Sequence, residues 1–260
     1  MALDFTEFFG YSPLDPHPNA VAARSNEQCP FVEGMCIKRF RDGTVSGSCA
    51  LKPTTSDPVI CCPHRMYANN YQILSGVAES AFGPGVRLVD AAAPVKDEFD
   101  GRRVAVFGKR WGKELRLPSR GSGGGYFVDW DLALIGSDGE LTEFVAAEVQ
   151  TIDTTGNYRK AFDAYRQGNQ FDGRDSGGMN WENVSKRILP QLIYKGHVLR
   201  REPLCRKGLY FICPKQVYER LRQRLGNELA SYSLQPGSLT FHWYDLGAEA
   251  PSGQLRDLNL

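Results

Sequence analysis

The sequence predicts a mixed α/β fold, in which a central sheet is flanked by helices, with a small cysteine-rich region in front of it. Three observations lead to this prediction. Short β-prone segments alternate with helical segments through the last two thirds of the chain. Two of the apolar segments have the pattern of a β-hairpin. Five of the seven cysteines lie in a stretch rich in turn-forming residues near the N-terminus.

The N-terminal quarter of the chain is rich in turn-forming residues and has few long segments with a regular apolar spacing. Pro13, Pro16 and Pro18 interrupt any long helix before the first cysteine. Residues 29–65 are predicted to form a loop-rich module instead of a packed helix. A helix is predicted from Met66 to about Ala81, because apolar residues recur there at helical spacing.

Strands and helices alternate in the rest of the chain. The predicted strands span residues 104–107, 114–117, 126–135, 141–150, 208–213 and 239–244. The predicted helices span residues 157–167, 181–194 and 217–225. Pro190 is expected to kink or end the second of these helices.

The composition excludes some classes of function. With 31 basic and 30 acidic residues, the chain does not resemble a protein that binds DNA through excess positive charge alone, although local basic faces remain possible. There is no apolar run long enough to span a membrane, and the N-terminal residues lack the pattern of a secretory signal. We therefore expect a cytoplasmic protein with no membrane partner. Thiols stay reduced in that compartment, so clustered cysteines suggest metal more than disulfides.

Acidic residues meet at one end of the predicted hairpin. Asp129 lies near the start of its first strand, Glu148 and Gln150 lie near the end of its second, and the two strands are antiparallel. Both ends should therefore come together, with Glu148 and Gln150 on one face because they are two residues apart. Asp131 faces the same side as Asp129 and is a rival for the first position. Acidic residues in strands also often face solvent, which is the alternative interpretation.

This grouping has the chemistry that phosphodiester hydrolysis needs. Mg²⁺ takes hard oxygen ligands, and Asp129 and Glu148 would supply them. The residue at position 150 would orient the attacking water or contact the phosphate. Glu114 is a further candidate ligand. The segment Asp153-Thr154-Thr155-Gly156 should lie beside this site, although its polar residues are also typical of a helix cap.

The cysteines have a spacing that four thiolates of a metal site can adopt. With Cys62 as the last member, Cys29, Cys36, Cys49 and Cys62 give the pattern C-x6-C-x12-C-x12-C. Four thiolates form a tetrahedral shell for Zn²⁺ or Fe, and a metal would stabilise a segment with few apolar residues. The alternative is a set of buried thiols without metal, since cysteine packs well in cores. We interpret Cys205 and Cys213 as such core residues.

The acidic motif resembles a known nuclease signature. Asp129, a hairpin and then Glu148-Val149-Gln150 are similar to the D…(D/E)xK pattern of the PD-(D/E)xK nucleases, with Gln in place of Lys. The run from Glu148 to Tyr158, together with Val128-Asp129-Trp130, resembles the NotI restriction endonuclease family, which carries E-x-Q. The resemblance spans roughly residues 25–215. It implies a PD-(D/E)xK core with Asp129, Glu148 and Gln150 as the catalytic residues, and Gln can only orient water through hydrogen bonds.

The cysteine segment is also similar to that family, whose N-terminal metal-binding fold holds iron through four cysteines. The resemblance is carried by Cys29-Pro30-Phe31, Cys36-Ile37-Lys38 and the run from Ile60 to Arg65. It implies a metal site formed by four cysteines, holding Fe or Zn. The doubled Cys61-Cys62 leaves the fourth ligand open. Cys62 is preferred because it precedes Pro63, as the last ligand of the family does, and His64 is a weaker alternative.

The resemblance implies a Type II restriction endonuclease that cuts both strands of a specific DNA duplex with Mg²⁺. Such enzymes act as homodimers on palindromic sites, and the family suggests a GC-rich target. Residues 1–66 would form the metal-binding region and residues 67–260 the endonuclease domain. Arg159 and Lys160 are candidate phosphate contacts. Two other functions are considered, a non-catalytic DNA-binding protein organised by its metal and a repair or nicking nuclease with the same core.

Overall fold

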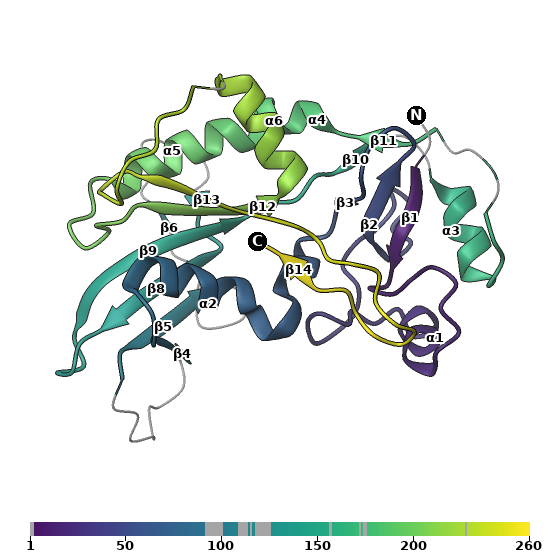
Figure 1. The fold of residues 1–260 in the computed structure, drawn as a ribbon, viewed down its shortest axis with the longest axis horizontal. Coiled ribbons are helices and arrows are strands. Elements are labelled where there is room, and N and C mark those ends of the chain that lie inside the picture. Colours follow the sequence, from purple (N-terminus) through teal and green to yellow (C-terminus); the bar gives the residue numbers. More distant parts are fainter. Residues whose placement is uncertain are drawn as a thin grey trace.

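The computed structural model describes residues 3–91, 101–108, 114, 116–117, 126–155, 158–171, 173, 176–226 and 228–260. Its largest element is a curled seven-stranded sheet with the strand order β14-β13-β12-β9-β8-β5-β4 (Figure 1). Its strands in chain order are β4 (Arg87–Asp90), β5 (Arg103–Gly108), β8 (Trp130–Ile135), β9 (Leu141–Val149), β12 (Leu209–Pro214), β13 (Leu239–Leu246) and β14 (Leu258–Asn259). The prediction of a mixed α/β fold is confirmed.

Neighbouring strands of this sheet meet in both orientations. β9 is parallel to β12, β12 to β13, and β4 to β5. β8 is antiparallel to both β5 and β9, and β14 is antiparallel to β13. The predicted hairpin therefore exists as β8 and β9, at the centre of the sheet. Residues 145–149 of β9 are buried because they lie between two neighbouring strands and under helices on either face of the sheet.

Helices cover both faces of the large sheet. α2 (Ala68–Phe82) lies on one face, whereas α5 (Leu189–Leu199) and α6 (Lys215–Leu225) lie on the other (Figure 1). The side chains of β9 alternate accordingly. Its odd-numbered residues from 145 to 149 join the buried cluster of α2, and Ala146 joins the cluster of α5 and α6. Glu148 therefore belongs to the face that α5 covers.

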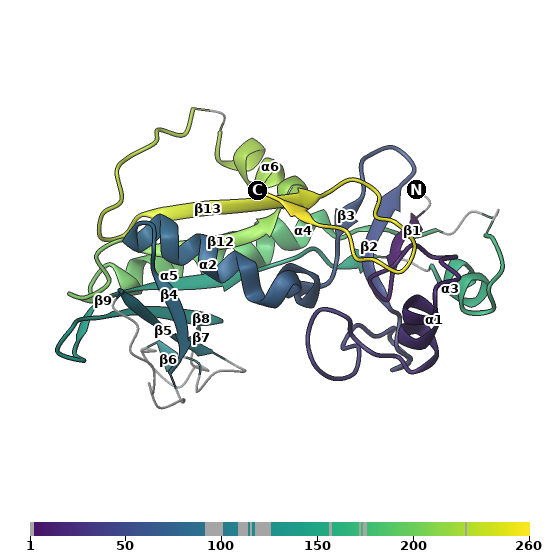
Figure 2. The same ribbon diagram turned by 60° about the horizontal axis from the view of Figure 1, so that its bottom comes forward.

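An N-terminal sheet lies beside the large one (Figures 1 and 2). It has the order β1-β2-β3 and is antiparallel, and its strands are β1 (Leu3–Phe8), β2 (Ser48–Pro53) and β3 (Val59–Ile60). Neither β1 nor α1 (Pro18–Ser25) was predicted from the sequence. Pro18 begins α1 instead of breaking it, because proline has no N–H to lose in the first turn of a helix.

A buried ion pair connects this N-terminal sheet to the start of α2. The guanidinium of Arg65 donates to both carboxylate oxygens of Glu7, at 2.7 Å and 3.0 Å, and to the carbonyl of Arg256 at 2.7 Å. Arg65 lies in a 3₁₀ turn, η1 (Pro63–Tyr67), directly after the last cysteines of the module. The pair thus fixes the cysteine segment against β1 and the C-terminal segment.

The helix predicted for residues 181–194 is longer than expected. It consists of α4 (Trp181–Asn183), a π-helical turn, η2 (Val184–Ile188), and α5, so it continues past Pro190 to Leu199. A proline removes one helical hydrogen bond and crowds the carbonyl four residues earlier. The wider π turn before Pro190 accommodates that carbonyl, which is why the helix does not end.

The remaining elements are short. α3 (Arg159–Arg166) packs near the N-terminal sheet, where the hydroxyl of Tyr165 donates to Asp4 at 2.8 Å. Two small antiparallel pairs are formed by β6 (Arg116–Leu117) with β7 (Tyr126–Phe127), and by β10 (Thr154–Thr155) with β11 (Gly178–Met179). None of the helices in the described ranges has the length and apolar character needed to cross a lipid bilayer.

Candidate active site

The two ends of the hairpin meet, as predicted. Trp130 pairs with Ala147 in the β8–β9 register, so Asp129, one residue before β8, stands beside Glu148. The backbone N–H of Val149 donates to Oδ2 of Asp129 at 2.9 Å. This bond anchors the carboxylate of Asp129 against the last residue of β9.

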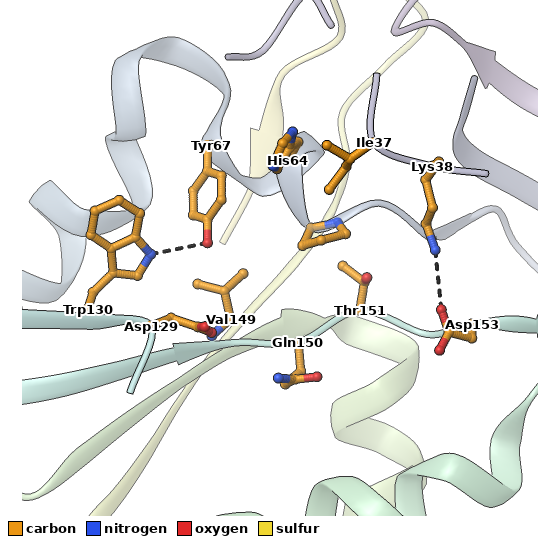
Figure 3. Close-up of a pocket in the computed structure, with 11 residues that line it drawn as sticks. Ile37, Lys38, His64, Tyr67, Asp129, Trp130, Val149, Gln150, Thr151 and Asp153 are labelled. Carbon is orange, nitrogen blue, oxygen red and sulfur yellow. Dashed lines mark hydrogen bonds and ion pairs between the residues drawn. The ribbon is translucent and has the colours of Figure 1, made fainter. Parts of the chain in front are cut away.

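Glu148 and Gln150 share one face of their strand. The amide Nε2 of Gln150 donates to Oε1 of Glu148 at 3.1 Å. In Figure 3, Gln150 extends to the opposite side of the strand from Tyr67 and His64. Oε2 of Glu148 is buried and has no hydrogen-bond partner within the described part of the chain. The site therefore contains a carboxylate oxygen without a protein partner.

The electrostatics of the site follow from burial. Burial, and after it the carboxylate of Glu148, raise the pKa of Asp129 from 3.8 to about 7. The N–H of Val149 and the ammonium of Lys195 oppose this increase, whereas Glu114 adds to it. Two carboxylates that lie side by side repel each other when both are ionised, so the pair favours a shared proton or a bound cation. Glu114 stays a candidate for a further ligand.

Asp131, the rival for the first position, has different neighbours. It pairs across the hairpin with Ala146, two residues before Glu148. Burial raises the pKa of Cys205 to about 11, and the carboxylate of Asp131 contributes to that increase. Asp129 is therefore the aspartate beside Glu148, and Asp131 lies toward Cys205 on the same face of the sheet.

One residue of the site was not found from the sequence. Lys195, on α5, is buried, and its Nζ donates to Oε1 of Glu148 at 2.5 Å. A signal for it exists in the sequence. Lys195 lies on the same face of α5 as Leu192 and Leu199, the other buried residues of this helix. It therefore occupies an apolar position of an amphipathic helix.

A cavity of about 400 Å³ opens beside the hairpin end (Figure 3). Asp129, Gln150 and Asp153 line it from the sheet side, and Lys38 and His64 line it from the cysteine segment. The two sides are joined. Nζ of Lys38 pairs with Asp153 at 3.3 Å, and the hydroxyl of Thr151 donates to the carbonyl of Cys61 at 3.1 Å. The cysteine segment therefore forms one wall of the cavity at the candidate site.

The model of the family described as "Restriction endonuclease NotI" matches residues 16–223. This range is most of the chain, and it includes the cysteine segment, the hairpin and α5. The chain belongs to the NotI restriction endonuclease family. It is a restriction endonuclease, an enzyme that hydrolyses phosphodiester bonds of DNA. No individual curated protein matches it.

In this NotI-family enzyme, four of the five N-terminal cysteines influence one another. Burial raises the pKa of Cys49 well above its ordinary value, and Cys62, Cys36 and Cys29 add to the increase. Cys61 is different. Its Sγ donates to the carbonyl of Val59 at 3.2 Å, and burial raises its pKa to about 12 without a contribution from the other cysteines.

Within the described part of the chain, no three or more His, Cys, Asp or Glu side chains converge closely enough to form a metal shell, and this holds for Cys29, Cys36, Cys49 and Cys62 as well. His64 lies beside Cys29, with 3.9 Å between Nδ1 and Sγ. Cys205 and Cys213 are fully buried, so their prediction as core residues is confirmed.

Other predicted residues of the NotI-family enzyme have mixed outcomes. Thr154 and Thr155 form β10 and do not cap α3, whose N-cap is Tyr158 without a side-chain capping bond, so the capping interpretation is wrong for them. Gly156 lies outside the described residues. Arg159 pairs with Asp42 at 3.0 Å and is thus engaged within the protein, whereas Lys160 is exposed.

Proposed function

We propose that this NotI-family enzyme cuts both strands of a specific DNA duplex with Mg²⁺, with Asp129 and Glu148 as the metal ligands. The observation that carries the proposal is Oε2 of Glu148, which is buried beside Asp129 and lacks a hydrogen-bond partner among the described residues. A buried carboxylate oxygen without a partner is costly. A divalent cation would satisfy it, and two carboxylates suit the preference of Mg²⁺ for hard oxygen ligands.

The residues present fit this cation. When bound, Mg²⁺ polarises the scissile phosphate, lowers the pKa of a bound water and stabilises the leaving oxygen. Asp129 would hold the cation from the start of β8, fixed by the N–H of Val149. Glu148 would hold it from the end of β9. Gln150 would orient the attacking water through its amide, because an amide carries no charge and cannot accept a proton.

The target and the assembly are proposed from the family. A palindromic, GC-rich site would be read by a homodimer, since a twofold protein axis matches a twofold DNA axis. Exposed Lys160 is a candidate phosphate contact, and salt-sensitive binding is expected from it. Light scattering should find a dimer on DNA, and a monomer both free and on DNA would contradict this assembly.

We also propose a structural Fe or Zn site at Cys29, Cys36, Cys49 and Cys62. The mutual influence of these four thiols supports it, and the isolation of Cys61 favours Cys62 as the fourth ligand. Four thiolates leave no open position for water, which is typical of a structural site. Residues 1–66 would thus be the metal-binding region and residues 67–260 the endonuclease domain, with the cytoplasm as the compartment where the thiols stay reduced.

The test is the Glu148→Ala variant. The parent should digest a fully sequenced DNA into discrete fragments in Mg²⁺, and the mapped ends define the site. Glu148→Ala should abolish cleavage while a duplex carrying that site still binds, because the change removes a metal ligand and no docking contact. Full cleavage by Glu148→Ala would contradict the proposal. Cleavage of one strand only would favour a nicking nuclease, and Mg²⁺-independent binding without cleavage by the parent would favour a non-catalytic DNA-binding protein.

A further inference from the structure

Lys195 occupies a position where a lysine is unexpected. It lies on the face of α5 that packs into the core, between Leu192 and Leu199, and its side chain is 5% exposed. Lysine is almost never fully buried in proteins unless it is paired. The partner of this lysine must therefore explain its presence.

That partner is the candidate metal ligand. Nζ of Lys195 donates to Oε1 of Glu148 at 2.5 Å, and Gln150 donates to the same oxygen at 3.1 Å. Oε2 is buried and has no partner among the described residues. The two carboxylate oxygens of Glu148 therefore differ. Within the described residues, Oε1 accepts both hydrogen bonds and Oε2 accepts none.

Stability does not explain the pair. Removing two charges from water is expensive, and well-packed apolar residues at the same positions are often as stable or more stable. A second lysine–glutamate pair lies on the same strand. Lys207 pairs with Glu143 at 2.8 Å near the other end of β9, but there the lysine side chain is 27% exposed and keeps contact with water. A fully buried pair at the candidate site points to a role in its chemistry.

We propose that Lys195 is a positioning residue that clamps Oε1 of Glu148, so that Oε2 is presented to the metal. Its ammonium also supplies, from a helix, the positive charge that position 150 lacks, where the nuclease signature described above has lysine and this chain has glutamine. This inference rests on the proposed function. It assigns to α5 a part of the site that the strand motif does not contain.

The fold holds this ammonium rigidly. Leu192 and Leu199 anchor α5 in the buried cluster that also contains Leu209 and Phe211 of β12, the strand beside β9. The π-helical turn before α5 lets the helix continue past Pro190, so that Lys195 reaches Glu148. A group fixed by packing on both sides loses little entropy when it positions its partner, which is the requirement for a preorganised site.

The test compares Lys195→Met with Lys207→Met. Both changes remove the charge of a lysine paired to a glutamate of β9 and keep a long apolar side chain. On a supercoiled plasmid that the parent linearises in Mg²⁺, Lys195→Met should cut about 100-fold more slowly or worse, the size expected for loss of one preorganised charge. Lys207→Met should cut at the parental rate. Both variants should still bind a duplex that carries the mapped site.

A second measurement separates positioning from folding. The melting temperature of the metal-free protein should fall in Lys195→Met, because Glu148 is left as a buried charge without its partner. Adding Glu148→Gln to that variant should restore part of the loss, and it should not restore cleavage. Adding Gln150→Lys instead should restore cleavage by at least 10-fold over Lys195→Met, since it places an ammonium where Oε1 already accepts a hydrogen bond.

The outcomes separate this inference from the proposed function. If Glu148→Ala cuts like the parent, the proposed function fails, whatever Lys195 does. If Glu148→Ala is inactive and Lys195→Met cuts at the parental rate, only the role of Lys195 is wrong. If Lys195→Met does not fold, the double variant with Gln150→Lys decides: a folded and active protein supports the inference, and a folded but inactive one overturns it.

Discussion

Glu148 is the residue on which the chemistry of the site depends most, because its two carboxylate oxygens have different surroundings. Oε1 accepts hydrogen bonds from Lys195 and Gln150, whereas Oε2 has no partner within the described residues. Asp129 lies beside it and is fixed through the backbone of Val149. A cation held between these carboxylates would therefore meet ligands that are already oriented.

The two candidate aspartates can be separated by matched substitutions. Asp129→Asn should reduce cleavage by at least about 100-fold, because it weakens a ligand beside Glu148 and removes preorganised charge at the metal. Asp131→Asn should retain most of the cleavage, since Asp131 pairs with Ala146 and lies toward Cys205. The measurement is the rate of plasmid linearisation in Mg²⁺. Loss of activity in Asp131→Asn alone would reverse the assignment.

The pKa of Asp129 predicts a pH dependence of stability. Burial and Glu148 raise this pKa from 3.8 to about 7, so the folded chain holds a proton that the unfolded chain has already released. The stability from this proton is fully present below the unfolded pKa and is lost as the pH rises through about 7. In chelator, this contribution should lower the melting temperature between about pH 4 and pH 7, and Asp129→Asn should reduce the fall. Identical profiles for the two proteins would contradict the assignment.

Magnesium should act in the opposite direction. A carboxylate binds metal only when it is ionised, so the increase in melting temperature caused by Mg²⁺ should be larger above the pKa of Asp129 than below it. The same scans, repeated with Mg²⁺, measure this difference directly.

At the scale of single residues, the sequence predicts the strand part of the site and misses the helical part. The meeting of Asp129 with Glu148 follows from local rules, because a hairpin is antiparallel and its side chains alternate. Lys195 lies 47 residues after Glu148 in the chain, and only the docking of α5 on the sheet joins them. The available signal was a lysine at apolar spacing, which identifies a buried lysine but does not name its partner.

Among the elements, the cysteine module is the one whose chemistry is most open to test. Elemental analysis of the purified parent should find about one tightly held Fe or Zn per chain. Cys62→Ser should lose this metal and lower the melting temperature by about 2–4 °C for each kcal/mol lost. Cys61→Ser should keep the metal, because Cys61 donates to Val59 and does not influence the other thiols. Equal metal content in both variants would contradict the ligand assignment.

The elements differ in how far local sequence determines them. The strands of the hairpin and β12 were predicted because they are β-prone and bounded by turn residues. α1 was not, because it is short and follows several prolines, and β1 was missed although its buried and exposed residues alternate at its start. The helix through Pro190 was predicted to kink or end, and it continues because a π turn absorbs the proline, which no local propensity indicates.

At the scale of the whole molecule, tertiary pairing decides what the sequence analysis left open. The order β14-β13-β12-β9-β8-β5-β4 depends on parallel contacts between strands that are distant in the chain, and apolar pattern alone does not select them. The cavity beside Asp129 also needs two distant segments. Lys38 and His64 come from the cysteine segment, and the opposite wall comes from the end of the hairpin. If the module holds the proposed metal, loss of that metal is therefore expected to disturb the site as well as the fold.

The most direct test of the central claim is to map the fragment ends after digestion of a fully sequenced DNA. The parent enzyme with Mg²⁺ should give discrete fragments whose ends share one palindromic sequence, cut on both strands at symmetric positions. Chelation of Mg²⁺ should stop the reaction reversibly, and Glu148→Gln should give no fragments although the protein remains folded. Random ends, cleavage that does not need a divalent cation, or full digestion by Glu148→Gln would contradict the account of a metal-dependent site at Asp129 and Glu148.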